Sequence, residues 1–253
     1  MSDSQSSPDP FPPPPAAGDI LPPPRMAGDP VTDAWSPTGA VSFGWQAVKA
    51  KPESVAFFFV AGLCGSLLST AGQVMVQLAA PGANRSGAAV VIVVLGACLM
   101  LINIPIQMFF SMNSTRYALR LCRGEPAGFQ DLFKLDFDPY WGFFGAAMLI
   151  GIAVFCGCLL LIVPGVLLAL GWYVALPMVV DGRGGPMAAM RASWEATRGR
   201  RGAIFVLILL IFGLSLLGLL ACCVGTIVTG AIVNLAHVYT YLKLTGQPVA
   251  LPR

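Results

Sequence analysis

Six long apolar stretches, joined by alternately basic and nearly uncharged connections, constrain this chain more than any other feature. The stretches cover residues 54–80, 87–112, 142–162, 165–180, 203–221 and 224–242. Most of them reach the roughly 20 residues that a helix needs to cross the hydrocarbon core of a bilayer. Charged residues make up 11% of the 253-residue chain, against about 25% in soluble domains. The pattern therefore predicts an all-α polytopic bundle of six transmembrane helices.

The basic residues predict the orientation of the bundle. The chain has 15 Lys and Arg residues, and only Arg85 falls on a connection that would lie outside the cell. Lys and Arg accumulate in cytoplasmic loops, so both termini are expected in the cytoplasm. The fourth stretch is short and contains Pro164, Gly165 and Pro177, which predicts a tilted, kinked or partly re-entrant segment.

Proline concentrates at the N-terminus, where residues 1–40 hold eleven of the chain's 21 prolines. Proline has no backbone N–H and fixes φ, so this stretch is expected to form a disordered cytoplasmic tail. Residues 41–248 form the predicted transmembrane domain, and residues 249–253 form a short C-terminal tail. The proline runs are also a possible docking site for a cytoplasmic partner protein.

A weak internal repeat links the first and last pairs of stretches. Trp45 and Trp194 precede stretches one and five, and each is followed by a basic residue four positions later. Stretches two and six both leave through a Tyr seven residues before a Gly, at Tyr117–Gly124 and Tyr239–Gly246. This spacing predicts two related hairpins in parallel orientation, each preceded by an amphipathic elbow helix.

The elbow before stretch five, residues 186–200, combines an apolar stripe with basic residues. Met187, Met190 and Trp194 recur at helical spacing, which suits a helix lying in the membrane interface. The arginines expected to contact anionic lipid headgroups are Arg191, Arg198, Arg200 and Arg201.

Polar residues inside the apolar stretches are few and uncharged. Asn103 and Gln107 share a face of stretch two, and Asn234 and His237 share a face of stretch six. One interpretation is a polar path for a solute. The favoured interpretation is hydrogen bonding between helices. No charged residue lies inside any stretch, which argues against a proton- or ion-coupled carrier.

The sequence predicts neither a cofactor nor a metal site. His237 is the only histidine, and the seven cysteines have no metal-ligand spacing. The sequence leaves open whether Cys156 and Cys158, or Cys222 and Cys223, form disulfides. The net charge of +3 is too small to argue for nucleic-acid binding.

Several short motifs carry a resemblance to a known family. They are Phe43-Gly44-Trp45 with Lys49, Val163-Pro164-Gly165, Asp181-Gly182 with Gly185-Pro186, residues 190–194, and the closing Tyr239 to Gly246. Over residues 41–248 the chain resembles a broad bacterial family of six-span proteins. That family includes the membrane domain attached to some glycerophosphoryl diester phosphodiesterases. The resemblance implies a helical module of the bacterial inner membrane without a settled biochemical role. The acidic and histidine cluster of the phosphodiesterase catalytic domain is missing here, so that activity is not expected.

Together these patterns favour a non-enzymatic module that organises the envelope through interactions with membrane lipids and a cytoplasmic partner. The alternative is a passive transporter or channel for a small or lipid-like solute, lined by Asn103, Gln107, Asn234 and His237. The sequence leaves open whether the protein forms a homo-oligomer.

Overall fold

The computed structural model describes residues 35–79, 87–134 and 137–250. The predicted partner-docking runs of the tail, and Arg85, fall outside these residues. The described chain is helical from α1 to α9. The helices are α1 (Pro37–Ala50), α2 (Glu53–Ala79), α3 (Gly87–Cys122), α4 (Phe137–Leu160), α5 (Ile162–Gly171), α6 (Ala175–Val180), α7 (Pro186–Ala196), α8 (Arg201–Leu220) and α9 (Cys222–Leu244), with a short 3-10 helix η1 (Phe129–Phe133).

Six helical segments are long and apolar enough to cross a membrane, which confirms the predicted fold class. Their outer surfaces carry exposed large apolar side chains, such as Leu78, Leu160 and Leu220. Soluble proteins rarely expose so many large apolar side chains, whereas the lipid of a bilayer solvates them. The protein is therefore a multi-pass membrane protein.

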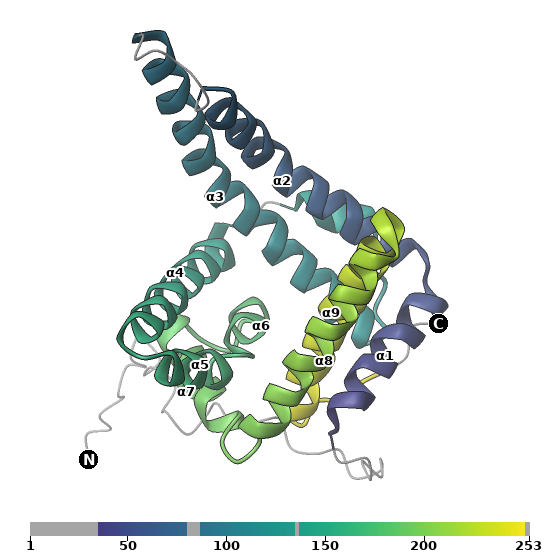
Figure 1. Ribbon diagram of the computed structural model, residues 1–253. Helices are drawn as coiled ribbons and strands as arrows, with labels where there is room; N and C mark the ends of the chain where they lie inside the picture. Colours follow the sequence, from purple (N-terminus) through teal and green to yellow (C-terminus); the bar gives the residue numbers. More distant parts are fainter. Residues whose placement is uncertain (1–34, 80–86, 135–136, 251–253) are drawn as a thin grey trace, which may run out of the picture.

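The spans pair as three hairpins, formed by α2 with α3, α4 with α5 and α8 with α9. Figure 1 shows α2 and α3 running side by side and extending beyond the other helices, while α1 lies beside α9. Gly72 and Gly96 allow α2 and α3 to touch, because a Cβ on either glycine would lie 2.8 Å from the other's carbonyl oxygen. The large buried side chains Phe57, Met112, Leu132 and Tyr241 gather in one core toward the ends of α3 and α9.

Besides α4, which begins at Phe137, five residues before the predicted start, two helices depart from the sequence expectation. The first is α1, which begins at Pro37, inside the predicted tail, because Ser36 accepts the Gly39 N–H as an N-cap and proline suits the first helical position. The second is α3, which continues ten residues past the predicted end at Met112 to Cys122. Arg116 and Arg120 therefore lie on a helix and not in a loop. The last turns of α3 are amphipathic, with Tyr117, Ala118 and Leu121 on the buried face.

The fourth span is interrupted, as the sequence predicts. Residues 172–174 form a turn between α5 and α6. The turn lies between Pro164 and Pro177, the two prolines that predict it, and three to five residues before Pro177. Cys156 and Cys158 are free thiols, and the side chains of Cys222 and Cys223 lie outside the described ones.

Candidate functional site

Three helices, α3, α6 and α9, end with the same backbone motif. Each is closed by a glycine in the left-handed region, Gly124 (φ 72°), Gly182 (φ 72°) or Gly246 (φ 69°). In each case the N–H after the glycine bonds the carbonyl five residues earlier: Glu125 to Arg120 at 2.9 Å, Arg183 to Met178 at 3.2 Å, and Gln247 to Leu242 at 2.8 Å. This is the Schellman motif, which satisfies carbonyls at a helix end and favours glycine because it has no Cβ.

The ends of α3 and α9, which share the spacing from Tyr to Gly, also share the same local geometry. Tyr117 and Tyr239 stand at matching positions and both stack on a phenylalanine. The ring centroids are 3.8 Å apart for Phe57 with Tyr117 and 4.5 Å apart for Phe43 with Tyr239. The end of α6 at Gly182 is a third copy of the motif. The spacing from Tyr to Gly does not predict it, because α6 has no corresponding tyrosine. The Asp181-Gly182 pair is the sequence feature that indicates this helix end.

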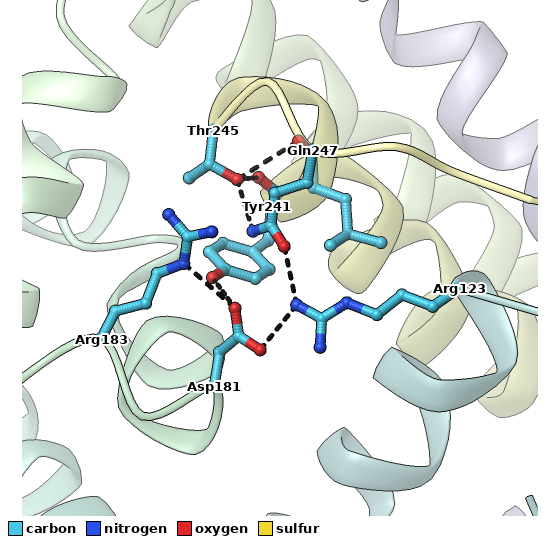
Figure 2. A network of polar contacts seen from close by, with 7 residues as sticks. Arg123, Asp181, Arg183, Tyr241, Thr245 and Gln247 are labelled. Carbon is cyan, nitrogen blue, oxygen red and sulfur yellow. Dashed lines mark hydrogen bonds and ion pairs between the residues drawn. The ribbon is translucent and has the colours of Figure 1, made fainter. Parts of the chain in front are cut away.

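The residues flanking the three glycines meet in one polar network, shown in Figure 2. We call this network the hub. Its members are Arg123, Asp181, Arg183, Tyr241, Thr245 and Gln247.

Asp181 is the common acceptor of the hub. Its carboxylate accepts hydrogen bonds from the Tyr241 hydroxyl at 2.6 Å, from Arg123 Nη2 at 2.6 Å and from Arg183 Nε at 3.1 Å. Arg123 Nη2 also bonds Gln247 Oε1 at 2.6 Å, and Gln247 Nε2 donates to Thr245 Oγ1 at 2.9 Å. These bonds link the ends of α3, α6 and α9. Because α6 continues the fourth span that α5 begins, one end of each hairpin meets here. We call this end of the molecule, with its arginines, the basic end. Charge-assisted bonds of this kind are roughly twice as strong as neutral ones.

The interruption in the fourth span is held by a second set of polar contacts. Pro177 has no N–H, so it provides no helical donor for the carbonyl of Tyr173, four residues earlier. His237 of α9 contacts that carbonyl through Nε2 at 2.8 Å. A carbonyl oxygen only accepts hydrogen bonds, so in this contact Nε2 carries the proton and is the donor.

Another carbonyl at the interruption, that of Gly171, is bonded by α7 and by Thr197, the residue that caps this helix. Ser193 Oγ donates to it at 2.9 Å and Thr197 Oγ1 at 3.1 Å. The Trp194 ring lies over Gly171, where a Cβ would approach the ring within 2.2 Å. The elbow is therefore packed onto the broken span, which explains why α7 buries Ser193 and Thr197.

The four intramembrane polar candidates are not assembled into one site. Asn103 Nδ2 bonds Gln107 Oε1 at 3.4 Å within α3, and Asn234 Nδ2 bonds the Gly230 carbonyl at 2.9 Å within α9. His237 bonds a segment outside its own helix, the turn at Tyr173, whereas the bonds described for the three amides lie within α3 or within α9. Within the described chain, no hydrogen bond joins the α3 pair to the α9 pair.

The elbow arginines divide into two groups. Arg191, Arg198 and Arg200 are exposed. Arg201 is partly buried, with its guanidinium carbon 3.8 Å from the centre of the Trp194 ring. A cation over an aromatic face is stabilised there, so Arg201 fixes Trp194 while the other three remain accessible.

A cavity of about 550 Å³ opens beside the hub, and we call it the basic pocket. Four cationic side chains line it, Arg116, Arg120, Arg123 and Lys134. The acidic side chains at its wall are Glu125, Asp131 and Asp181. From the sequence, these cations are expected in a loop, where they indicate the orientation of the spans. In the structure, α3 and η1 bring them together.

Asp131 anchors the η1 wall of the pocket. It bonds Arg120 Nη1 at 2.8 Å, lies 3.3 Å from Lys134 Nζ and accepts the Gly128 N–H at 3.1 Å. Burial raises the pKa of Asp131, but the Gly128 hydrogen bond, Lys134 and Arg120 together hold it below its usual range. The depressed pKa means that Asp131 contributes stability above the ordinary pKa of an aspartate, and that this contribution is lost as the pH falls through the lowered value.

The described residues contain no group of three or more His, Cys, Asp and Glu side chains that could hold a metal ion. What the basic end offers instead is fixed cationic donors: guanidinium groups oriented by carboxylates beside an open cavity. Such groups suit the binding of phosphate or carboxylate oxygens.

Comparison with known proteins gives only partial matches. No family model matches the chain, and no solved structure matches it significantly. The chain is 32% identical over 102 residues to "Uncharacterized protein Rv2560" of Mycobacterium tuberculosis and to "Uncharacterized protein Mb2590" of Mycobacterium bovis. In both cases the match covers 40% of this chain and 31% of the relative's length. The structure and these relatives together describe a multi-pass helical membrane protein similar, over less than half its length, to mycobacterial proteins of uncharacterised function.

Proposed function

We propose that the protein is a non-enzymatic organising module of the bacterial inner membrane, with its basic end in the cytoplasm, and that its elbow binds anionic lipid headgroups. The observation that carries the proposal is the make-up of the elbow. Met187 is 63% exposed and Trp194 is 36% exposed. Arg191, Arg198 and Arg200 are exposed on the same short segment.

This combination suits the membrane interface. Exposed apolar side chains enter the boundary between headgroups and acyl chains, while neighbouring arginines reach phosphates. The cytoplasmic leaflet carries the anionic lipids, and each Lys or Arg near it gains about 1 kcal/mol. The cytoplasmic placement of the basic end follows from the distribution of Lys and Arg. A cytoplasmic partner recruited by the Pro-rich residues 1–40 belongs to the same proposal.

Removing the exposed elbow charges is expected to reduce the enrichment of anionic lipid around the protein. Arg191, Arg198 and Arg200 changed together to Gln should weaken anionic-lipid binding about 100-fold and so lower the lipid retained after purification, since about 1 kcal/mol is lost per charge. The measurement is lipid analysis of protein extracted from membranes of defined phosphatidylglycerol and phosphatidylethanolamine content.

The matched control is Glu195→Gln on the same helix. It removes an exposed charge of opposite sign, so retention should stay level or rise. Equal retention by wild type and the triple variant would refute lipid binding by the elbow.

A further inference from the structure

We propose that the basic pocket is a binding site for a phosphate group, separate from the elbow. Two chemical sources can supply that group, the headgroup of an anionic phospholipid and a soluble phosphate compound. The proposal concerns different residues from those of the elbow, and neither depends on the other.

The charges of the pocket are arranged to leave cationic donors available. Among the described residues, Arg120 bonds Asp131 through Nη1, and Arg123 bonds both Asp181 and Gln247 through Nη2. A guanidinium has five N–H donors in a fixed fork. The described bonds therefore orient both arginines and leave the other N–H groups of each fork for an oxyanion.

These cations also remain accessible to a ligand. The exposed fraction of the side chain is 41% for Arg120, 28% for Arg123 and 53% for Lys134, whereas that of Asp131 and of Asp181 is 9%. An incoming anion therefore meets these cations before Asp131 and Asp181, while Glu125 is the exposed carboxylate of the wall. The volume of about 550 Å³ falls in the range of roughly 300–1,000 Å³ found for small-ligand sites.

The surroundings of the pocket place it near lipid. Phe129 and Phe133 of η1 flank the wall residue Asp131 and are 46% and 62% exposed. Exposed aromatic rings are typical of the membrane–water interface. Basic pockets between transmembrane helices on the cytoplasmic side are suited to lipid headgroups.

Arg123 belongs to both the pocket and the hub. A phosphate bound in the pocket would share Arg123 with Asp181, the carboxylate that joins the three hairpins. Binding would thus act on the contacts that hold the hairpin ends together.

Two variants with opposite expected effects test the proposal in the purified full chain. In the first, Arg120→Gln with Lys134→Gln removes two cations and should weaken binding about tenfold or more. In the second, Glu125→Gln removes an exposed acidic side chain from the wall and should strengthen binding about threefold. Lys49→Gln with Lys51→Gln at the end of α1 is the matched control, because it also removes two cations, neither of which lines the pocket, and it should leave pocket binding unchanged.

The probes are dioctanoyl phosphatidylglycerol, glycerol 3-phosphate and inorganic phosphate, each titrated against the protein in zwitterionic micelles and followed by native mass spectrometry. Binding of all three with these variant effects supports a site for phosphate from either source. Binding of the lipid alone identifies a headgroup site, and binding of only the soluble compounds identifies a solute site. If the double variant does not fold, Glu125→Gln decides.

Saturable binding that neither pocket variant alters, or no binding of any probe, would overturn the proposal. Lipid binding that is weakened by the elbow variant, Arg191, Arg198 and Arg200 changed to Gln, and by neither pocket variant would assign lipid binding to the elbow and remove it from the pocket. The failure of one proposal is thereby distinguishable from the failure of the other.

Discussion

Replacement of Asp181 by Ala is expected to lower the free energy of unfolding by about 3 kcal/mol, near the lower end of the cost of breaking a buried ion pair. The change removes the acceptor shared by the Tyr241 hydroxyl, Arg123 and Arg183. Both guanidinium groups would then remain close together without their carboxylate. Because Arg123 and Arg183 are 28% and 21% exposed, water screens part of the loss. Unfolding by sodium dodecyl sulfate in mixed micelles measures it.

Asp131→Ala provides the matched comparison. Its carboxylate is as little exposed as that of Asp181, at 9%, but its cationic partners Arg120 and Lys134 are 41% and 53% exposed. More exposed pairs contribute less, so this variant should lose about 1 kcal/mol. Equal losses in the two variants, or no loss for Asp181→Ala, would show that the hub does not join the hairpins.

Replacement of His237 by Ala is expected to cost about 2 kcal/mol, because it leaves the Tyr173 carbonyl without a donor inside the membrane domain. The imidazole also packs on the Tyr173 ring, with centroids 4.5 Å apart. Asn234→Ala is the control on the same helix. In the described part of the chain its amide bonds the Gly230 carbonyl of its own helix, so its loss should be below about 1 kcal/mol.

A double-mutant cycle with Pro177 tests the reason for the His237 contact. Pro177→Ala supplies a backbone N–H four residues after Tyr173, so a helical hydrogen bond becomes available to that carbonyl. In this background the loss on His237→Ala should be smaller by about 1 kcal/mol, a coupling that SDS unfolding of the four variants measures. The same loss in both backgrounds would refute the assignment.

The sequence was sufficient to predict the features that depend on local pattern. The six spans follow from apolar length, and the equivalent ends of α3 and α9 follow from the spacing of Tyr117 with Gly124 and Tyr239 with Gly246. The interruption of the fourth span follows from its prolines. Each of these needs only the chemistry of neighbouring residues along the chain.

The hub and the basic pocket depend instead on contacts between distant segments. Arg123 and Asp181 are 58 residues apart in the chain, and Arg123 and Gln247 are 124 apart. A single sequence does not show which helix ends meet, so the loop cations were interpreted only as signals of orientation. The extension of α3 to Cys122 was missed because its polar residues look like a loop until the buried face formed by Tyr117 and Leu121 is known.

The central claim is that the three hairpins return to one side of the membrane and are joined there by the hub. Labelling of single cysteines with a membrane-impermeant maleimide, in a variant without the native cysteines, tests it most directly. We expect Leu161→Cys, in the turn between α4 and α5, to react in intact cells, and Glu125→Cys and Arg198→Cys to react only after the inner membrane is permeabilised. Reaction of Glu125→Cys or Arg198→Cys from outside, or protection of Leu161→Cys, would contradict the account.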